Sequence, residues 1–165
     1  MKVVALLRHG KSSWDEPSLA DHDRPLAPRG REASRRIAGW VAAHDVRPEL
    51  VLCSTATRAR ATIDLVHAAL GSPRVELEEG LYHASAADLM TRLQVVPETV
   101  AHVLLVGHNP GLHDLLDLIA APGSHDVEAF PTGALATLEL DVGAWQDARP
   151  GCARITALAL PRSLR

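Results

Sequence analysis

Short apolar segments alternate with helical patterns along this chain of 165 residues, and this alternation limits the possible folds more than any other feature. Five segments rich in Val, Leu and Ile are too short for helices and are expected to be strands. They lie at 2–7, 50–53, 103–106, 135–140 and 155–160. Between them, apolar residues recur at helical spacing at 30–44, 57–70, 85–96 and 111–121. This order predicts an α/β fold, a three-layer sandwich whose mostly parallel central sheet has helices on both faces.

The size and composition of the chain narrow the classes of protein that it can be. Its length is that of one domain, expected to span residues 1–165. With 47% hydrophobic residues and a formal net charge of -3, no bulk charge favours nucleic acid or an anionic membrane as a partner. The two cysteines form no metal or redox motif, and no leader or membrane-spanning segment is seen. We therefore expect a cytoplasmic protein, either a monomer or a weak dimer.

Cationic and imidazole side chains follow three of the predicted strands. Arg8 and His9 come directly after the first strand, Arg58 follows the second at a short distance, and His108 follows the third. The carboxyl ends of parallel strands share one edge of a sheet, where ligands of open α/β sheets bind. We therefore expect these four side chains to meet in one pocket, although they are separated by as many as 100 positions.

Two guanidinium groups and two imidazoles suit a compact dianion such as phosphate. Guanidinium presents its N–H groups as a fork that matches two phosphate oxygens, and it stays charged at any working pH. A neutral imidazole can attack phosphorus if one ring nitrogen keeps its lone pair while the other donates to an acceptor. One histidine could thus be a nucleophile and the other a phosphate ligand. Lys11, two residues after His9, and Asn109, directly after His108, are further candidates for binding the substrate.

Other catalytic motifs fail on inspection. Gly10-Lys11-Ser12 resembles the end of a P-loop, but Ala5 stands where that loop needs a glycine. His108 and His113 lack the intervening glutamate of a zinc helix, and no Gly-x-Ser-x-Gly turn occurs. These absences disfavour a nucleotide triphosphatase, a metal hydrolase and a serine hydrolase. We expect neither a metal nor a cofactor.

Three motifs together resemble the histidine phosphatase superfamily, which has the phosphoglycerate mutase-like fold. They are Arg8-His9-Gly10, Ser54 with Arg58 four residues later, and Gly107-His108. The segments RHGKSSW, DHDRPLAPRG, LYHASAADL, VGHNPGL and PTGALATLEL are similar to the SixA-like phosphohistidine phosphatase branch of that superfamily. The resemblance implies that His9 is phosphorylated during turnover, that Arg8, Arg58 and His108 hold the phosphoryl oxygens, and that no metal is needed.

Many relatives in this superfamily carry a glutamate that acts as general acid, in a longer insertion than this chain has. Glu78, Glu79 and Asp88 are candidates here, but their positions at a strand end and in the first turn of a helix favour a structural role. An alkoxide leaving group needs a proton from the enzyme, whereas phosphohistidine can leave as imidazole, whose conjugate acid has a pKa of about 6.5. The missing acid therefore favours phosphohistidine as the substrate.

The expected function is a phosphatase that hydrolyses phosphohistidine, with a phosphorylated protein as the favoured partner. A small phosphorylated molecule is the alternative substrate, which would make the chain a phosphomonoesterase. A phosphate-binding module without turnover is a third possibility, although binding alone would not need a nucleophile. A mutase is disfavoured, because mutases need the acid insertion and a second acceptor pocket.

Overall fold

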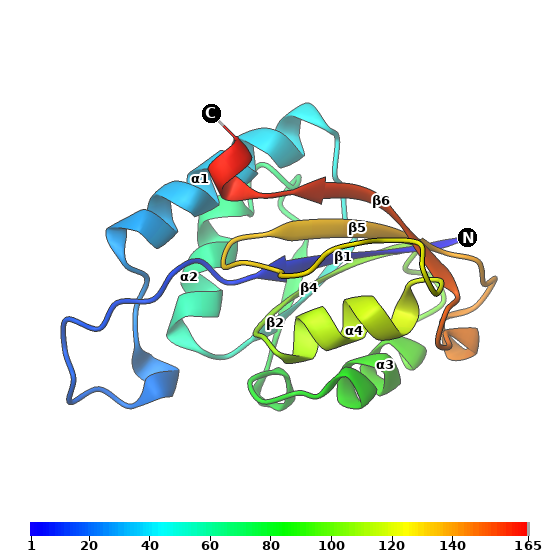
Figure 1. The fold of residues 1–165 in the computed structure, drawn as a ribbon, viewed down its shortest axis with the longest axis horizontal. Coiled ribbons are helices and arrows are strands. Elements are labelled where there is room, and N and C mark those ends of the chain that lie inside the picture. The colour runs from blue at the N-terminus through cyan, green and yellow to red at the C-terminus, as the bar shows by residue number, and fades with distance from the viewer. Residues whose placement is uncertain (165) are drawn as a thin grey trace.

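The computed structural model describes residues 1–164, which form one six-stranded sheet with helices on both faces (Figure 1). The strands are β1 (Lys2–Arg8), β2 (Leu50–Ser54), β3 (Arg74–Glu78), β4 (His102–Gly107), β5 (Leu135–Leu140) and β6 (Ala153–Ala159). Their order across the sheet is β3-β2-β4-β1-β5-β6. The pairs β3–β2, β2–β4 and β4–β1 are parallel, whereas β5 is antiparallel to both of its neighbours. The predicted α/β sandwich with a mostly parallel sheet is confirmed.

Four α-helices cover the sheet, two on each face (Figure 1). They are α1 (Pro28–Ala43), α2 (Thr57–Val66), α3 (Ala86–Gln94) and α4 (Gly111–Ile119). Short 3-10 turns lie at η1 (Asp21–Asp23), η2 (Glu79–Leu81), η3 (Trp145–Asp147) and η4 (Pro161–Ser163). The helices α1 and α2 pack side by side on one face, and α3 and α4 do so on the other.

The central strand β1 is buried on both faces, which explains why it reads as an unbroken apolar run. Val4 and Leu6 point into the core under α3 and α4, while Ala5 and Leu7 point into the core under α1 and α2. Because both faces of β1 are covered, only its ends reach solvent. The polar residues that follow its carboxyl end are therefore placed by a central strand that is covered on both faces.

The strand β3 is absent from the five predicted strands, so the sequence prediction was incomplete there. Its residues Arg-Val-Glu-Leu-Glu contain no apolar run, and none of them is fully buried. The strand lies at the edge of the sheet and pairs only with β2. Pairing with a neighbour, and not the hydrophobicity of its own sequence, makes this segment a strand. The helix predicted over 57–70 ends earlier, at Val66.

Two glycines let α1 approach the turn that follows β1. A Cβ atom on Gly30 would lie 2.3 Å from the carbonyl oxygen of Lys11, and one on Gly10 would lie 2.7 Å from the carbonyl oxygen of Gly30. Only glycine permits such backbone contact. The first turn of α1 therefore supports the backbone just beyond His9. No helix among residues 1–164 has the length and apolarity needed to cross a membrane.

Candidate active site

The carboxyl ends of β1, β4 and β2 bring the predicted residues together. Arg8 is paired with Gly107 in the parallel register of β1 and β4, so the next residues, His9 and His108, are neighbours. Their ring centroids lie 4.9 Å apart. Arg58 enters from α2, and its Nε lies 3.4 Å from Nε2 of His9.

The ring of His9 is held in one orientation by the backbone. Its Nδ1 lies 2.6 Å from the carbonyl oxygen of Gly10. A carbonyl can only accept, so Nδ1 carries the proton and Nε2 keeps its lone pair. That lone pair accepts the Nε–H of Arg58. His9 is 6% exposed, and this burial, aided by Arg58 and Arg8, lowers its pKa to about 4. The imidazole is thus neutral at pH 7, as a nucleophile requires.

A buried threonine ties the turn at Gly10 to α2. The hydroxyl of Thr62 accepts the backbone N–H of Gly10 at 3.0 Å and donates to the carbonyl oxygen of Arg58 at 2.8 Å. Thr62 has no exposed surface. This one side chain therefore links the peptide that orients His9 to the helix turn that carries Arg58.

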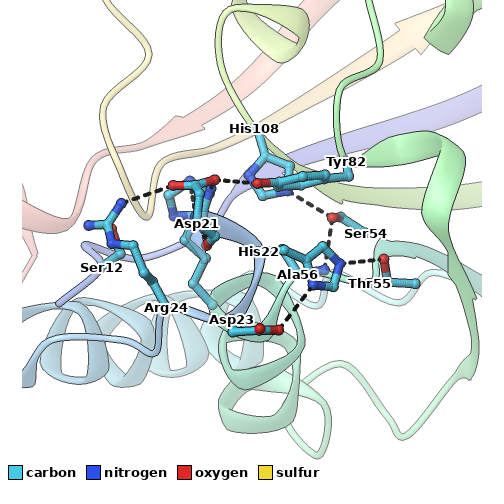
Figure 2. A network of polar contacts seen from close by, with 12 residues as sticks. Ser12, Asp21, His22, Asp23, Arg24, Ser54, Thr55, Ala56, Tyr82 and His108 are labelled. Atoms are coloured by element: carbon cyan, nitrogen blue, oxygen red, sulfur yellow. Dashed lines mark hydrogen bonds and ion pairs between the residues drawn. The ribbon is translucent and has the colours of Figure 1, made fainter. Parts of the chain in front are cut away.

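His108 is oriented by Ser54, at the end of β2. Its Nε2 lies 2.8 Å from the Ser54 hydroxyl, which also accepts the backbone N–H of Ala56 at 3.2 Å (Figure 2). Burial, together with the nearby His9 and Arg58, lowers the pKa of His108 to about 3. Since Ser54 occupies Nε2, the second ring nitrogen of His108 is left for another partner.

Two buried nitrogen atoms of the site have no hydrogen-bond partner within residues 1–164. They are Nδ1 of His108 and Nε of Arg8. Arg8 otherwise donates through Nη1 to the carbonyl oxygen of Phe130 at 3.1 Å, and burial and the nearby Arg58 lower its pKa. Buried polar atoms in native proteins are nearly always paired, so two such atoms at one site indicate a place for a ligand with acceptor oxygens.

Asp21, in η1, accepts two hydrogen bonds from the guanidinium of Arg58. Its Nη1 donates to the carbonyl oxygen of Asp21 at 2.6 Å, and its Nη2 donates to the carboxylate at 2.9 Å. Figure 2 shows Asp21 between Arg24, which lies 3.1 Å from the carboxylate, and Tyr82, which donates its hydroxyl to the same group. Asp21 thereby sets the direction in which Arg58 presents its Nε to His9.

Asp21 and Tyr82 were missed as site residues in the sequence analysis. Hydrogen bonding to Tyr82, followed by Arg58 and Arg24, holds the pKa of Asp21 below its usual range, so this carboxylate is ionised. Burial and the Asp21 carboxylate raise the pKa of Tyr82. One signal was present, because Tyr82 is the only tyrosine of the chain and lies in the segment LYHASAADL. Nothing in the local pattern pairs it with Asp21, 61 positions away.

The two further candidates for substrate binding, Lys11 and Asn109, lie in different surroundings. The amide of Asn109 donates to the carbonyl oxygen of Phe130 at 2.8 Å and accepts the backbone N–H of His113 at 3.2 Å. Lys11 is exposed and lines a groove that contains neither Arg8, His9, Arg58 nor His108. Both ends of Asn109 are thus engaged within the chain, while Lys11 is available to solvent.

The three candidate general acids have structural contacts or face solvent. Glu78 forms two hydrogen bonds of 2.8 Å with Arg92. Asp88 forms a capping box with Ser85 at the start of α3, and this bonding lowers its pKa. Glu79 begins η2 with an exposed side chain that makes no hydrogen bond within residues 1–164. Among all of residues 1–164, no group of three or more His, Cys, Asp or Glu side chains is placed to hold a metal ion.

A neutral, buried imidazole lies among two guanidiniums and a second imidazole at the carboxyl edge of an α/β sheet, an arrangement suited to binding phosphate. The chain belongs to the histidine phosphatase superfamily, whose branch 1 model matches residues 4–98. Within that superfamily it belongs to the SixA-like branch. It is therefore a hydrolase of the phosphatase class.

Two relatives in sequence and one in structure illustrate the placement. An uncharacterised protein of Mycobacterium tuberculosis is 37% identical over 163 residues, which cover 94% of this chain and all of the relative. Phosphohistidine phosphatase SixA of Escherichia coli is 34% identical over 141 residues, 84% of this chain and 85% of the relative. A structure of the protein histidine phosphatase SixA in complex with tungstate has a TM-score of 0.83, with 29% identity and 99% of each chain covered.

Proposed function

We propose that this protein hydrolyses phosphohistidine on another protein through a covalent phosphohistidine intermediate on His9. The orientation of His9 carries the proposal, because its Nδ1 is protonated toward Gly10 while its Nε2 lone pair faces the cationic side of the site. Nε2 attacks phosphorus, and the bond between phosphorus and the substrate nitrogen breaks. A water molecule then attacks phosphorus, the bond to Nε2 breaks, and inorganic phosphate leaves.

Arg8, Arg58 and His108 would hold the oxygens of the transferring phosphoryl group. Nε of Arg8 is a buried donor without a partner, and Nε of Arg58 already points at Nε2 of His9. His108 can donate from Nδ1 when the Ser54 hydroxyl donates to its Nε2. These donors are fixed before the reaction, so they stabilise developing charge without rearrangement. The tungstate complex of the similar protein SixA supports a site for a tetrahedral oxyanion in this chain, because tungstate is tetrahedral like phosphate.

The carboxylates around the site favour a P–N bond as the one that is cleaved. Asp21 is the carboxylate that contacts Arg58, and its lowered pKa leaves it without a proton to donate. The carboxylate of Glu78 accepts a hydrogen bond from Arg92, and that of Asp88 accepts one from the backbone N–H of Ser85. A histidine leaving group can accept a proton from water and depart as imidazole, whereas an alkoxide depends on a stronger acid.

The proposal is tested by trapping the intermediate. Protein denatured soon after mixing with a phosphorylated donor should carry acid-labile phosphate on His9. The His9→Ala variant should carry none, and the His102→Ala variant, changed at a histidine at the amino end of β4, should label like wild type. No label on wild type, or a label that persists in His9→Ala, would refute the mechanism and leave a phosphate-binding module.

The choice between phosphohistidine and a small phosphomonoester follows from leaving-group chemistry. Rates with aryl and alkyl phosphates should fall steeply as the pKa of the leaving group rises, while N-phosphoryl substrates remain fast. The Glu78→Gln, Glu79→Gln and Asp88→Asn variants should each hydrolyse phosphohistidine within about tenfold of wild type. A rate that is independent of leaving-group pKa, together with a loss of about a hundredfold in one of these variants, would favour the phosphomonoesterase.

A further inference from the structure

A groove of about 570 Å³ is lined in part by the segments that follow His9 and precede Gly133, and it is rich in positive charge. We call it the cationic groove and define it by its four basic lining residues, Lys11, Arg29, Arg36 and Arg162. Glu32 is its one acidic lining residue. Most of its lining residues come from α1 and η4, which contact each other, and η4 follows the edge strand β6 (Figure 1).

Short backbone segments connect the cationic groove to the phosphate site. Lys11 lies two residues after His9, and Thr132, another lining residue, precedes Gly133. The N–H of Gly133 donates to the carbonyl oxygens of Arg8 and His9, at 3.0 and 2.9 Å. The backbone that positions the nucleophile is thus continuous with both sides of the groove.

The charge of the groove is available for a partner. Lys11, Arg29 and Arg162 are exposed, and none of them forms an ion pair within residues 1–164. Only Arg36 is paired, with Glu32 at 3.4 Å. Since the whole chain has a formal net charge of -3, this excess of cations is local. Unpaired cations gathered at one concave surface are complementary to an acidic ligand.

We propose that the cationic groove binds an acidic segment of the phosphorylated protein, next to the phosphorylated side chain. This inference rests on the proposed function, which places a protein substrate at His9. The apolar part of the lining, which includes Pro28, Ala33 and Pro161, can pack against aliphatic side chains between the carboxylates. No aromatic residue lines the groove, so it offers no platform for stacking a nucleotide base.

Such a groove acts on recognition and leaves the chemical step unchanged. Single exposed ion pairs change affinity by only a few-fold, so several must act together. Reversing two of the charges turns attraction into repulsion and should weaken the binding of an acidic substrate by about tenfold or more at low salt. The effect should appear in KM and in the salt dependence of kcat/KM, while kcat stays the same.

The test uses two synthetic peptides that each contain one phosphohistidine, one flanked by Asp and Glu and the other by Asn and Gln, together with phosphoramidate. In the Arg29→Glu/Arg162→Glu variant, kcat/KM for the acidic peptide should fall about tenfold, while the other two substrates change less than about twofold. The Arg29→Gln/Arg162→Gln variant should show a smaller loss of the same kind. Arg149→Glu is the matched control, because Arg149 follows η3 at the opposite end of the sheet.

Equal losses with all three substrates, or no loss with the acidic peptide, would overturn the proposal. Binding of the unphosphorylated acidic peptide, followed by fluorescence anisotropy, separates this failure from failure of the proposed function. If wild type hydrolyses no N-phosphoryl substrate, the proposed function is wrong, whereas equal peptide affinity in wild type and the double variant refutes the groove alone. Tighter binding of single-stranded DNA than of the acidic peptide would also refute it.

Discussion

Removing the hydroxyl of Thr62 should destabilise the protein and slow it at the same time. In Thr62→Val, the backbone N–H of Gly10 loses its 3.0 Å partner in a fully buried place. The carbonyl oxygen of Arg58 is less affected, because it lies inside α2 and has the helical N–H as a second donor. One unsatisfied buried donor costs about 1–3 kcal/mol in the free energy of unfolding.

For a chain of this length that cost corresponds to a decrease in Tm of about 2–12 °C. The catalytic effect follows from the next hydrogen bond, since the carbonyl oxygen of Gly10 accepts Nδ1 of His9 at 2.6 Å. A Gly10 peptide that can turn away no longer fixes the His9 ring, and we expect kcat to fall about tenfold or more.

Urea unfolding and steady-state kinetics with phosphoramidate measure the two effects. Thr62→Ser keeps the hydroxyl and should recover most of both. Thr156→Val is the matched control, because the Thr156 hydroxyl is exposed where it donates to the carbonyl oxygen of Thr137. Loss of the Thr156 hydroxyl should change the free energy of unfolding by less than about 0.5 kcal/mol. If Thr62→Val were as stable and as active as wild type, the link between Gly10 and α2 would have no importance.

Four further predictions concern the site and its support. Folding lowers the pKa values of His9 and His108 from 6.5 to about 4 and about 3, so the unfolded chain binds more protons than the folded chain below pH 6.5. Urea midpoints should therefore fall as the pH drops from 6.5 toward 4, and these two histidines should change them little above pH 6.5. A midpoint that rises on acidification would contradict this prediction. Asp21→Asn should lower kcat/KM about tenfold or more for every substrate, since Asp21 positions Arg58. A loss confined to substrates with poor leaving groups would instead identify Asp21 as a general acid. Gly30→Ala should destabilise the protein by about 1–3 kcal/mol in thermal unfolding, while Gly39→Ala, with no atom within 4 Å of its new Cβ, should not destabilise it. Turnover should survive exhaustive chelation, and loss restored by one divalent ion would replace the mechanism by metal-assisted hydrolysis.

The sequence by itself determined the strands that carry the site and the four residues at or shortly after their carboxyl ends. The runs that became β1, β2 and β4 are buried on both faces, and such strands are apolar throughout. The change from apolar to polar residues at their carboxyl ends is therefore abrupt and can be recognised in the sequence. Because parallel strands share that edge, Arg8, His9, Arg58 and His108 could be placed together without a structure.

Only the tertiary structure decided which side chains support those four. Asp21 and Tyr82 lie on different turns, 61 positions apart, and no spacing rule connects them. The cationic groove likewise combines Lys11, Arg29 and Arg162 from the turn after β1, from α1 and from η4. Hydrophobic periodicity reports which face of an element is buried, but contacts between exposed loops depend on how the packed elements place them. The residues that orient the site therefore had to be found in the folded chain.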